Sequence, residues 1–212
     1  MLRAVLFDLD DTLMDHTHAM HAGLDEWCEE LGLPTGQQER FGALEKKWFA
    51  AYEKGEVSHR GQRIGRCREF LGKELSEEDA LKLYAGYLAA YRRNWQVFLD
   101  AKGAIDRAQA AGLKVGILTN GAREMQAAKL RAGGLDLPGV LLIPTVELSC
   151  PKPQREAYMK GCAQLGVATS QTLMVGDSLP NNVEGARAAG LQALYLRRDG
   201  SGDIASLDEL FN

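Results

Sequence analysis

Three acidic side chains stand close together near the N-terminus of the chain. The segment Phe7 to Leu13 reads FDLDDTL, so Asp8, Asp10 and Asp11 follow directly on the apolar run AVLF. Neighbouring carboxylates repel one another, and burial makes their charged forms still more costly unless a cation or hydrogen bonds compensate. The segment alone leaves two interpretations open: a solvated turn at the end of a strand, or a cluster of acids that binds a cation.

Other polar residues that could do chemistry follow apolar runs later in the chain. Thr119, Asn120 and Gly121 come directly after KVGIL, Lys152 lies between two prolines, and Asp177 comes after TLMVG. Taken singly, they could be a helix cap, a solvated lysine and a turn acid. Together, carboxylates favour Mg²⁺, whereas backbone N–H groups at a helix entrance and a lysine favour an anion. The set therefore indicates a site for Mg²⁺ and a phosphate group.

The spacing of apolar residues predicts the elements that carry these groups. Short apolar runs predict buried strands at residues 1–7, 114–118, 140–145, 172–175 and 192–196. Segments with helical spacing lie between them at residues 123–132, 154–165 and 183–189. Glycines follow helical runs as C-terminal caps do, at Gly112, Gly133, Gly166 and Gly190. This alternation predicts an α/β fold: a Rossmann-like parallel sheet with helices on both faces.

A long helical block separates the first predicted strand from the others. From about Thr17 to Asn94 apolar residues recur at three- and four-residue spacing without a strand pattern. We therefore expect a catalytic core formed by residues 1–14 and 96–212, and an all-helical domain formed by residues 15–95 inserted into it. Since ligands of open parallel sheets bind beyond the carboxyl ends of the strands, the candidate groups should converge at that edge of the core.

Composition limits the classes of partner. Lys and Arg number 25 against 29 for Asp and Glu, and the net charge of -4 provides no basic field for nucleic acid. No long apolar run and no basic-then-apolar leader is visible, so we expect no membrane span, no signal peptide and a cytoplasmic location. The 4 cysteines are scattered without a CxxC pair, which predicts reduced thiols that pack in the core.

A set of short motifs resembles those of the haloacid dehalogenase superfamily. The motifs are, in chain order, DxDxT at Asp8 to Thr12, LTNG at Leu118 to Gly121, KP at 152–153 and GDS at 176–178. The match spans the whole chain. The resemblance implies that the helical insertion is a cap of the first type, which closes over the core and selects the substrate.

The resemblance also implies a role for each motif residue. Asp8 would be the nucleophile that forms an aspartyl-phosphate, and Asp10 the general acid/base that protonates the leaving oxygen and then activates water. Asp8, the backbone carbonyl of Asp10 and Asp177 would bind Mg²⁺. Thr119 and Lys152 would hold phosphoryl oxygens, and Lys152 would also offset the charge around Asp8.

Within the first motif, the two catalytic acids need different directions. Asp8 and Asp10 would point to the same face of an extended chain, so the backbone must turn between them if one is to attack and the other to reach the leaving group. We interpret Asp11 as a turn acid without a catalytic part. Thr12 is expected to support the loop by hydrogen bonding.

The fourth motif departs from the family pattern. It usually continues to a second acid, but here Asn182 occupies that place. An amide can accept a hydrogen bond from Lys152 or from a metal-bound water, yet it contributes no charge. We expect altered metal affinity and retained catalysis.

A narrower resemblance involves the predicted cap. The segments AYEKGEV at 51–57 and REF at 68–70 are similar to the branch that holds N-acylneuraminate-9-phosphatases and pyrimidine 5'-nucleotidases. Among the basic residues of this region, Arg68 is the one expected to bind substrate. A solvated Arg68, or one that supports packing of the cap, is the alternative.

These observations together predict a Mg²⁺-dependent phosphatase of a small phosphomonoester, a nucleotide or a sugar phosphate, acting as a monomer or homodimer. A dehalogenase is disfavoured because halide leaves unprotonated and would not need Asp10. A phosphotransferase or mutase of the β-phosphoglucomutase type is an alternative with the same core. A non-catalytic module that binds phosphate or Mg²⁺ is another, but it would not require the complete set of Asp8, Asp10, Lys152 and Asp177.

Overall fold

The computed structural model describes residues 1–211, except for the side chain of Glu53. The chain divides into two compact units: Met1–His16 with the chain from Gln96 onward, and Thr17–Trp95. These boundaries lie close to those expected from the sequence.

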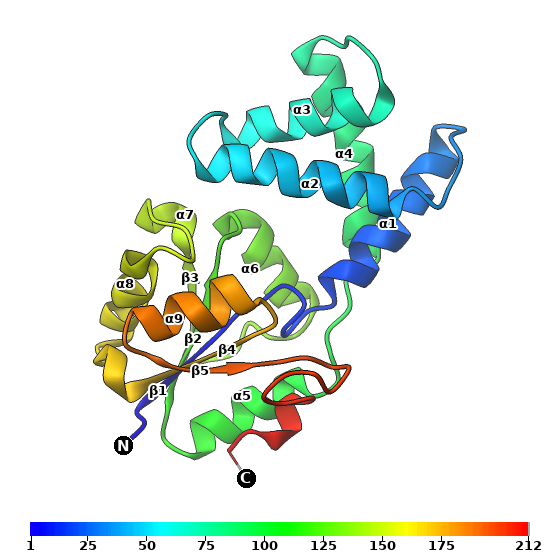
Figure 1. Cartoon of the computed structure of the whole chain (residues 1–212). Coiled ribbons are helices and arrows are strands. Elements are labelled where there is room, and N and C mark those ends of the chain that lie inside the picture. The colour runs from blue at the N-terminus through cyan, green and yellow to red at the C-terminus, as the bar shows by residue number, and fades with distance from the viewer. Residues whose placement is uncertain (212) are drawn as a thin grey trace. The chain divides into compact units, whose positions relative to one another are not determined.

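The first unit is built on a five-stranded sheet (Figure 1). Its strands are β1 (Ala4–Phe7), β2 (Lys114–Thr119), β3 (Val140–Pro144), β4 (Thr172–Gly176) and β5 (Gln192–Tyr195). The order is β3-β2-β1-β4-β5, and every neighbouring pair is parallel. Phe7, the last residue of β1, pairs with Ile117 on one side and with Val175 on the other, so β2 and β4 extend two residues and one residue beyond it. The predicted Rossmann-like α/β fold is confirmed.

Helices cover both faces of this sheet. On one face α8 (Arg155–Leu165) and α9 (Gly185–Ala188) form one hydrophobic cluster with Ala4 and Leu6 of β1. On the other face α5 (Ala101–Ala110) packs on β2, and α6 (Arg123–Ala132) packs on β3. Short elements complete the unit: α7 (Thr145–Leu148), a π-helical turn η2 (Leu179–Glu184), and 3-10 turns η1 (Thr169–Gln171) and η3 (Leu207–Glu209).

Two local features differ from the sequence interpretation. Helix α5 is the helical run that Gly112 was expected to follow, but its bounds were not predicted, because its buried positions are mostly alanines and give a weak apolar pattern. Gly133 ends α6 but keeps a right-handed φ of -86°, and Gly134 takes the left-handed turn with φ 65°. Gly133 is needed for space instead, since a Cβ there would lie 2.4 Å from Val97 Cγ2.

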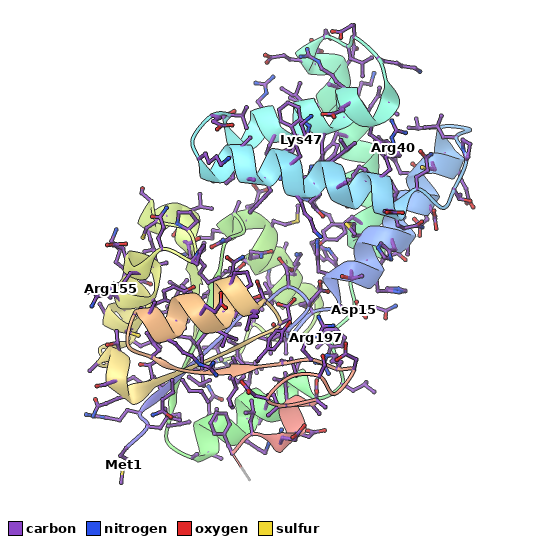
Figure 2. All side chains as sticks on the ribbon, in the orientation of Figure 1. Met1, Asp15, Arg40, Lys47, Arg155 and Arg197 are labelled. Atoms are coloured by element: carbon purple, nitrogen blue, oxygen red, sulfur yellow. The ribbon has the colours of Figure 1, made fainter. Side chains whose placement is uncertain are left out.

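The second unit consists of helices, as predicted, with no strand in the described chain between residues 17 and 95. The helices are α1 (His16–Glu30), α2 (Gln38–Glu53), α3 (His59–Leu71) and α4 (Glu77–Arg93). Aromatic rings fill its core: fully buried Trp27 stacks on Phe70 with 5.5 Å between ring centroids. On its surface Arg40 and Lys47 of α2 bond to the C-terminal turn of α3, at 2.8 Å from Phe70 O and Glu69 Oε1 respectively (Figure 2).

The cysteine prediction is consistent with the structure. Cys28, Cys67, Cys150 and Cys162 are all buried and form no disulfide. Among the described residues, the helices are all too short or too polar to cross a membrane.

Candidate active site

The nucleophile candidate lies at the carboxyl edge of the sheet beside a buried lysine. Asp8 directly follows β1, and its Oδ1 lies 2.8 Å from Lys152 Nζ. The two residues are 9% and 3% exposed, so this ion pair is largely removed from water. In such a buried pair each group offsets part of the cost of removing the other from water. The structure thus brings these two predicted catalytic residues together.

Asn120 positions Lys152 through its side chain, a role that the sequence interpretation missed. Its Nδ2 donates to Lys152 O at 2.9 Å, and its Oδ1 accepts from Lys152 N at 2.8 Å. The hydroxyl of Thr145 donates to the same oxygen at 2.8 Å. The sequence interpretation assigned only the backbone amide of Asn120, to a bound anion. The side chain ties the second motif to the third.

The first motif turns as soon as β1 ends. Leu9 O accepts from Leu13 N at 2.9 Å and from Met14 N at 3.0 Å, so the chain coils into a tight turn. Asp11 has a φ of 58° within this turn. The Asp10 carboxylate then bonds to Gln126 of α6, whereas the Asp8 carboxylate bonds to Lys152. The expected change of direction between the two acids is present.

Two residues of α6 that sequence reasoning missed hold Asp10. Gln126 Nε2 donates to Asp10 Oδ2 at 2.9 Å, and Lys129 Nζ forms an ion pair with Oδ1. Burial alone would raise the pKa of Asp10, but the charge of Lys129, assisted by His16 and Gln126, holds it well below the ordinary value. Asp10 is therefore ionised and fixed at both oxygens.

A sequence signal for this pair exists in the helical register. Residues 126, 129 and 130 are the buried positions of α6, spaced three and one apart as one helix face requires. Polar residues fill two of these inward positions. A helix that must cover a sheet but places Gln and Lys inward indicates buried polar partners rather than a solvated face.

The predicted phosphate-binding hydroxyl lies next to the same helix. Thr119 ends β2, is 2% exposed, and its Oγ1 accepts from Gln126 Nε2 at 2.7 Å and from Gly121 N at 3.2 Å. A Cβ on Gly121 would lie 2.4 Å from Gln126 Nε2, so the glycine of this motif leaves room for the glutamine amide.

Asp177 joins the fourth motif to the first. Its backbone N–H donates to Thr12 Oγ1 at 3.2 Å, and Thr12 Oγ1 lies 3.4 Å from Asp177 Oδ1, which agrees with the supporting role expected for Thr12. Burial, together with the charges of Asp8 and Asp11, raises the pKa of Asp177 to about 8, and Lys152 offsets only part of this. This part of the sheet edge carries more negative charge than its lysine neutralises.

The donor chemistry at this edge fits Mg²⁺. Among the described side chains, no group of three or more His, Cys, Asp or Glu is arranged to hold a metal ion. The predicted set is of another kind: two carboxylates, Asp8 and Asp177, and the backbone carbonyl of Asp10. The raised pKa of Asp177 indicates that these oxygens lack a compensating charge. A hard divalent cation that prefers oxygen ligands would supply it.

Asn182 supports the turn of the fourth motif. It is fully buried, and its Oδ1 accepts from Ser178 N at 2.9 Å, so that oxygen serves the turn rather than Lys152. Its Nδ2 is buried without a hydrogen-bond partner among the described residues. A Cβ on Gly176 would lie 2.4 Å from Asn182 Cγ, so this glycine also leaves space for an amide side chain.

The sequence model of the haloacid dehalogenase-like hydrolases matches residues 2–190 of the chain. The chain belongs to this family. The match covers all four motifs, so the family assignment and the geometry of the sheet edge involve the same residues. The chain is thus a hydrolase, and the superfamily resemblance is confirmed.

Relatives of this hydrolase match over most of its length. A phosphoserine phosphatase of Thermus thermophilus is 26% identical over 93% of this chain and 89% of the relative. A ribulose-1,5-bisphosphate 5-phosphatase of Halopiger xanaduensis is 30% identical over 92% of this chain and 84% of the relative. Neither belongs by name to the neuraminate phosphatase or nucleotidase branch, which gains no support from them.

Solved structures support the same fold. YfnB of Bacillus subtilis, crystallised with magnesium, has a TM-score of 0.85 and 24% identity, covering 99% of this hydrolase and 97% of YfnB. The L-2-haloacid dehalogenase of Xanthobacter autotrophicus has a TM-score of 0.70 and 23% identity, covering 93% of this chain and 78% of the dehalogenase. At these identities the likeness concerns the fold alone, and a shared fold does not determine the reaction.

Arg68 has a local partner in the helical unit of the hydrolase. Its Nε and Nη2 donate to Leu75 O at 2.9 and 2.6 Å, which orders the loop that follows α3. This agrees with the alternative in which the residue supports packing. Its contact with substrate stays a prediction.

Proposed function

We propose that this hydrolase is a Mg²⁺-dependent phosphatase that acts on a small phosphomonoester through an aspartyl-phosphate on Asp8. The observation that carries the proposal is the separate pairing of two acids with two buried lysines, Asp8 with Lys152 and Asp10 with Lys129. A leaving oxygen needs a proton from such an acid, whereas a leaving halide does not, so a second acid at this place favours a phosphate ester over a haloacid as substrate. The full-length relatives named as phosphatases support the same chemistry.

In the first step Asp8 Oδ attacks phosphorus, and the bond from phosphorus to the ester oxygen breaks. Asp10, which is ionised in the free protein, would first take up a proton when the phosphate group binds, then give that proton to the ester oxygen as the alcohol leaves. In the second step Asp10 takes a proton from water, which attacks the same phosphorus and releases inorganic phosphate and Asp8. Lys152, the Thr119 hydroxyl and the backbone N–H of Asn120 hold the phosphoryl oxygens, whereas the N–H of Gly121 donates to Thr119 Oγ1 instead.

Mg²⁺ would be held by Asp8, Asp177 and the backbone carbonyl of Asp10. When bound, it would neutralise negative charge on the phosphoryl oxygens. Lys152 Nζ, 2.8 Å from Asp8 Oδ1, orients the nucleophile and would offset negative charge at the phosphoryl group.

The substrate is expected to be a small phosphate ester. The relatives named above act, by their names, on phosphoserine and ribulose-1,5-bisphosphate, which share a phosphate ester of a primary alcohol on otherwise different carbon skeletons. Core motifs that contact only the phosphoryl group would accept either. The helical unit, as a cap, would then choose among sugar phosphates and nucleotides, and the neuraminate phosphatase and nucleotidase branch is one specific case.

The test is a phosphate-release screen over sugar phosphates, nucleoside monophosphates and small phosphoesters, with Mg²⁺ and with EDTA. We expect Mg²⁺-dependent hydrolysis by the wild type and at least about a thousandfold loss in Asp8→Asn. Acid quenching during turnover should trap a phosphoprotein that hydroxylamine cleaves, as it cleaves acyl phosphates. Appreciable turnover by deamidation-free Asp8→Asn would rule out the covalent step.

A sugar bisphosphate requirement would indicate the mutase alternative instead. The screen therefore includes a sugar monophosphate with and without its bisphosphate. For a phosphatase, phosphate release proceeds without the bisphosphate. If neither hydrolysis nor transfer is detected across the screen, the non-catalytic binding module is the better description.

A further inference from the structure

Helix α6 directs two polar side chains inward. Gln126 and Lys129 are 1% and 3% exposed, and residues three apart lie on the same side of a helix. Lysine is almost never fully buried unless it is paired. The burial of this lysine therefore requires a partner inside the protein, and Asp10 provides it.

The carboxylate of Asp10 is held at both oxygens. Lys129 Nζ pairs with Oδ1, and Gln126 Nε2 donates to Oδ2 at 2.9 Å. The terminal torsion of an aspartate is soft, so a carboxylate with one partner samples a broad range of directions. Two partners from one rigid helix remove that freedom. Lys152 bonds to Asp8 instead, so each acid has its own cation.

Gln126 also determines how the hydroxyl of Thr119 can bond. Its Nε2 donates to Thr119 Oγ1 at 2.7 Å, and the backbone N–H of Gly121 donates to the same oxygen at 3.2 Å. A hydroxyl has one donor and two acceptor positions. With both acceptor positions taken, the O–H of Thr119 is left to donate, and a phosphoryl oxygen accepts such a bond.

We infer that Gln126 and Lys129 are positioning residues for the phosphatase reaction. Together they aim the acid/base Asp10 and the phosphate-binding hydroxyl of Thr119. The inference rests on the proposed function. Neither residue acts on the reacting atoms itself; each works through the residue that it holds. The space left by Gly121, where a Cβ would lie 2.4 Å from Gln126 Nε2, is what allows the amide to reach both targets.

The two residues should have different kinetic signatures. Lys129 acts through Asp10. An ester with a poor leaving group needs the proton of Asp10, and an ester with a good leaving group does not. Replacing Lys129 should therefore slow the hydrolysis of alkyl phosphate esters selectively. Gln126 acts in addition through Thr119, which would bind the phosphoryl oxygens of every ester. Replacing Gln126 should therefore weaken the binding of all substrates and raise KM for each of them.

The experiment compares kcat/KM for the best sugar phosphate of the wild type with kcat/KM for p-nitrophenyl phosphate. Lys129→Met should lower the first by about 10- to 100-fold, the scale of a misplaced catalytic group, and the second by no more than about threefold. Lys129→Arg, which keeps the charge, should recover much of the loss. Gln126→Met should raise KM for both substrates by about tenfold.

Matched controls and a reference variant calibrate these losses. Lys160 and Gln109 make exposed hydrogen bonds to backbone carbonyls outside the four motifs, at 2.7 Å from Leu148 O and 2.8 Å from Pro138 O. Lys160→Met and Gln109→Met should leave both kcat/KM values unchanged. Asp10→Asn gives the full loss of the acid, roughly a hundredfold or more on the sugar phosphate.

Equal losses on both substrates in Lys129→Met, with a lower melting temperature, would mean a purely structural role and would overturn the inference. An unchanged ratio in Lys129→Met while the wild type hydrolyses both esters would overturn it and leave the proposed function standing. No hydrolysis by the wild type would overturn both. If Lys129→Met does not fold, Lys129→Gln, which also removes the charge, is measured in its place with the same expected selective loss on the sugar phosphate, and Gln126→Met tests the second signature independently.

Discussion

At the residue scale, the site separates its acids by giving them different surroundings. Asp8 and Asp10 each have a buried lysine, whereas burial and the charges of Asp8 and Asp11 raise the pKa of Asp177 to about 8. Groups of one chemical type can thus take different roles at one pH. The acid with the least compensation is the one expected to bind the cation, which is the arrangement that a metal-dependent site requires.

The raised pKa of Asp177 predicts that the stability of the metal-free protein depends on pH. Its pKa lies at about 8 in the folded chain against an ordinary 3.8, so the folded state retains a proton that the unfolded state loses. This contribution to stability is present below pH 4 and is lost as the pH rises through about 8. With EDTA present, the melting temperature should fall between pH 6 and about 8.5. Asp177→Asn should flatten that fall, and saturating Mg²⁺ should remove it in the wild type; an equal fall in Asp177→Asn would contradict the assignment.

Asn182 offers a second test at this scale. Asn182→Asp would place a carboxylate at a fully buried position, where Oδ1 accepts from Ser178 N and where Nδ2, which the second oxygen would replace, has no hydrogen-bond partner among the described residues. We expect metal-free Asn182→Asp to be destabilised by about 1–3 kcal/mol, and the Mg²⁺ concentration for half-maximal activity to fall, because charge is added near the metal. Metal titrations of activity and of melting temperature measure both. Identical titrations for the two proteins would remove this residue from any effect on the metal.

At the element scale, the sequence predicted what depends on periodicity and missed what depends on contacts. Strand β1 was predictable because all its residues are apolar and buried, and the alternation of strands with helices specifies a parallel sheet. Helix α6 was predicted at the residues where it occurs, but the contacts of Gln126 and Lys129 with Asp10 were not predicted. Whether a polar residue on a helix faces solvent or a carboxylate depends on the helix's rotation about its axis, which tertiary packing sets.

The loop after α3 allows a prediction about that element. Arg68 makes two bonds to Leu75 O, whereas Arg60 makes one long, exposed ion pair with Glu77 at 3.7 Å. Arg68→Ala should therefore lower the unfolding free energy by about 1 kcal/mol, and Arg60→Ala by less than about 0.5. Kinetics on a nucleotide or sugar phosphate and on p-nitrophenyl phosphate test the predicted substrate contact separately. A selective rise in KM for the larger substrate, without a shift in melting temperature, would restore recognition as the role of Arg68.

At the scale of the whole chain, residues far apart in sequence brace the first motif. The guanidinium of Arg198 bonds to both oxygens of Asp100 at 2.9 and 3.0 Å and to Thr12 O at 3.1 Å, and it lies 3.7 Å from the centroid of the Phe98 ring. Asp100 also accepts from the backbone of Leu207 at 2.9 Å. This arrangement could not be predicted, because nothing about an arginine in a C-terminal loop reveals partners nearly two hundred residues away. It connects the catalytic loop, the start of α5 and the C-terminal segment within one unit.

The Arg198 contacts lead to a prediction with a built-in control. Arg198→Met would leave Asp100, which is 8% exposed, without its cation. The neighbouring Arg197, labelled in Figure 2, instead forms an exposed pair with Asp199. We expect Arg198→Met to cost about 1–3 kcal/mol, a fall in melting temperature of roughly 3–10 °C, and Arg197→Met to cost less than about 0.5.

The pH dependence of that cost identifies its source. Burial alone would raise the pKa of Asp100, but Arg198, with the Leu207 N–H and Ser206, holds it below its ordinary 3.8. The contribution to stability is therefore present above about pH 4 and is lost as the pH falls through the lower, folded value. The gap in melting temperature between wild type and Arg198→Met should accordingly be widest near neutral pH and narrow at pH 3. A gap that stays constant down to pH 3 would mean that the stability comes from packing on Phe98 rather than from the charge of Asp100.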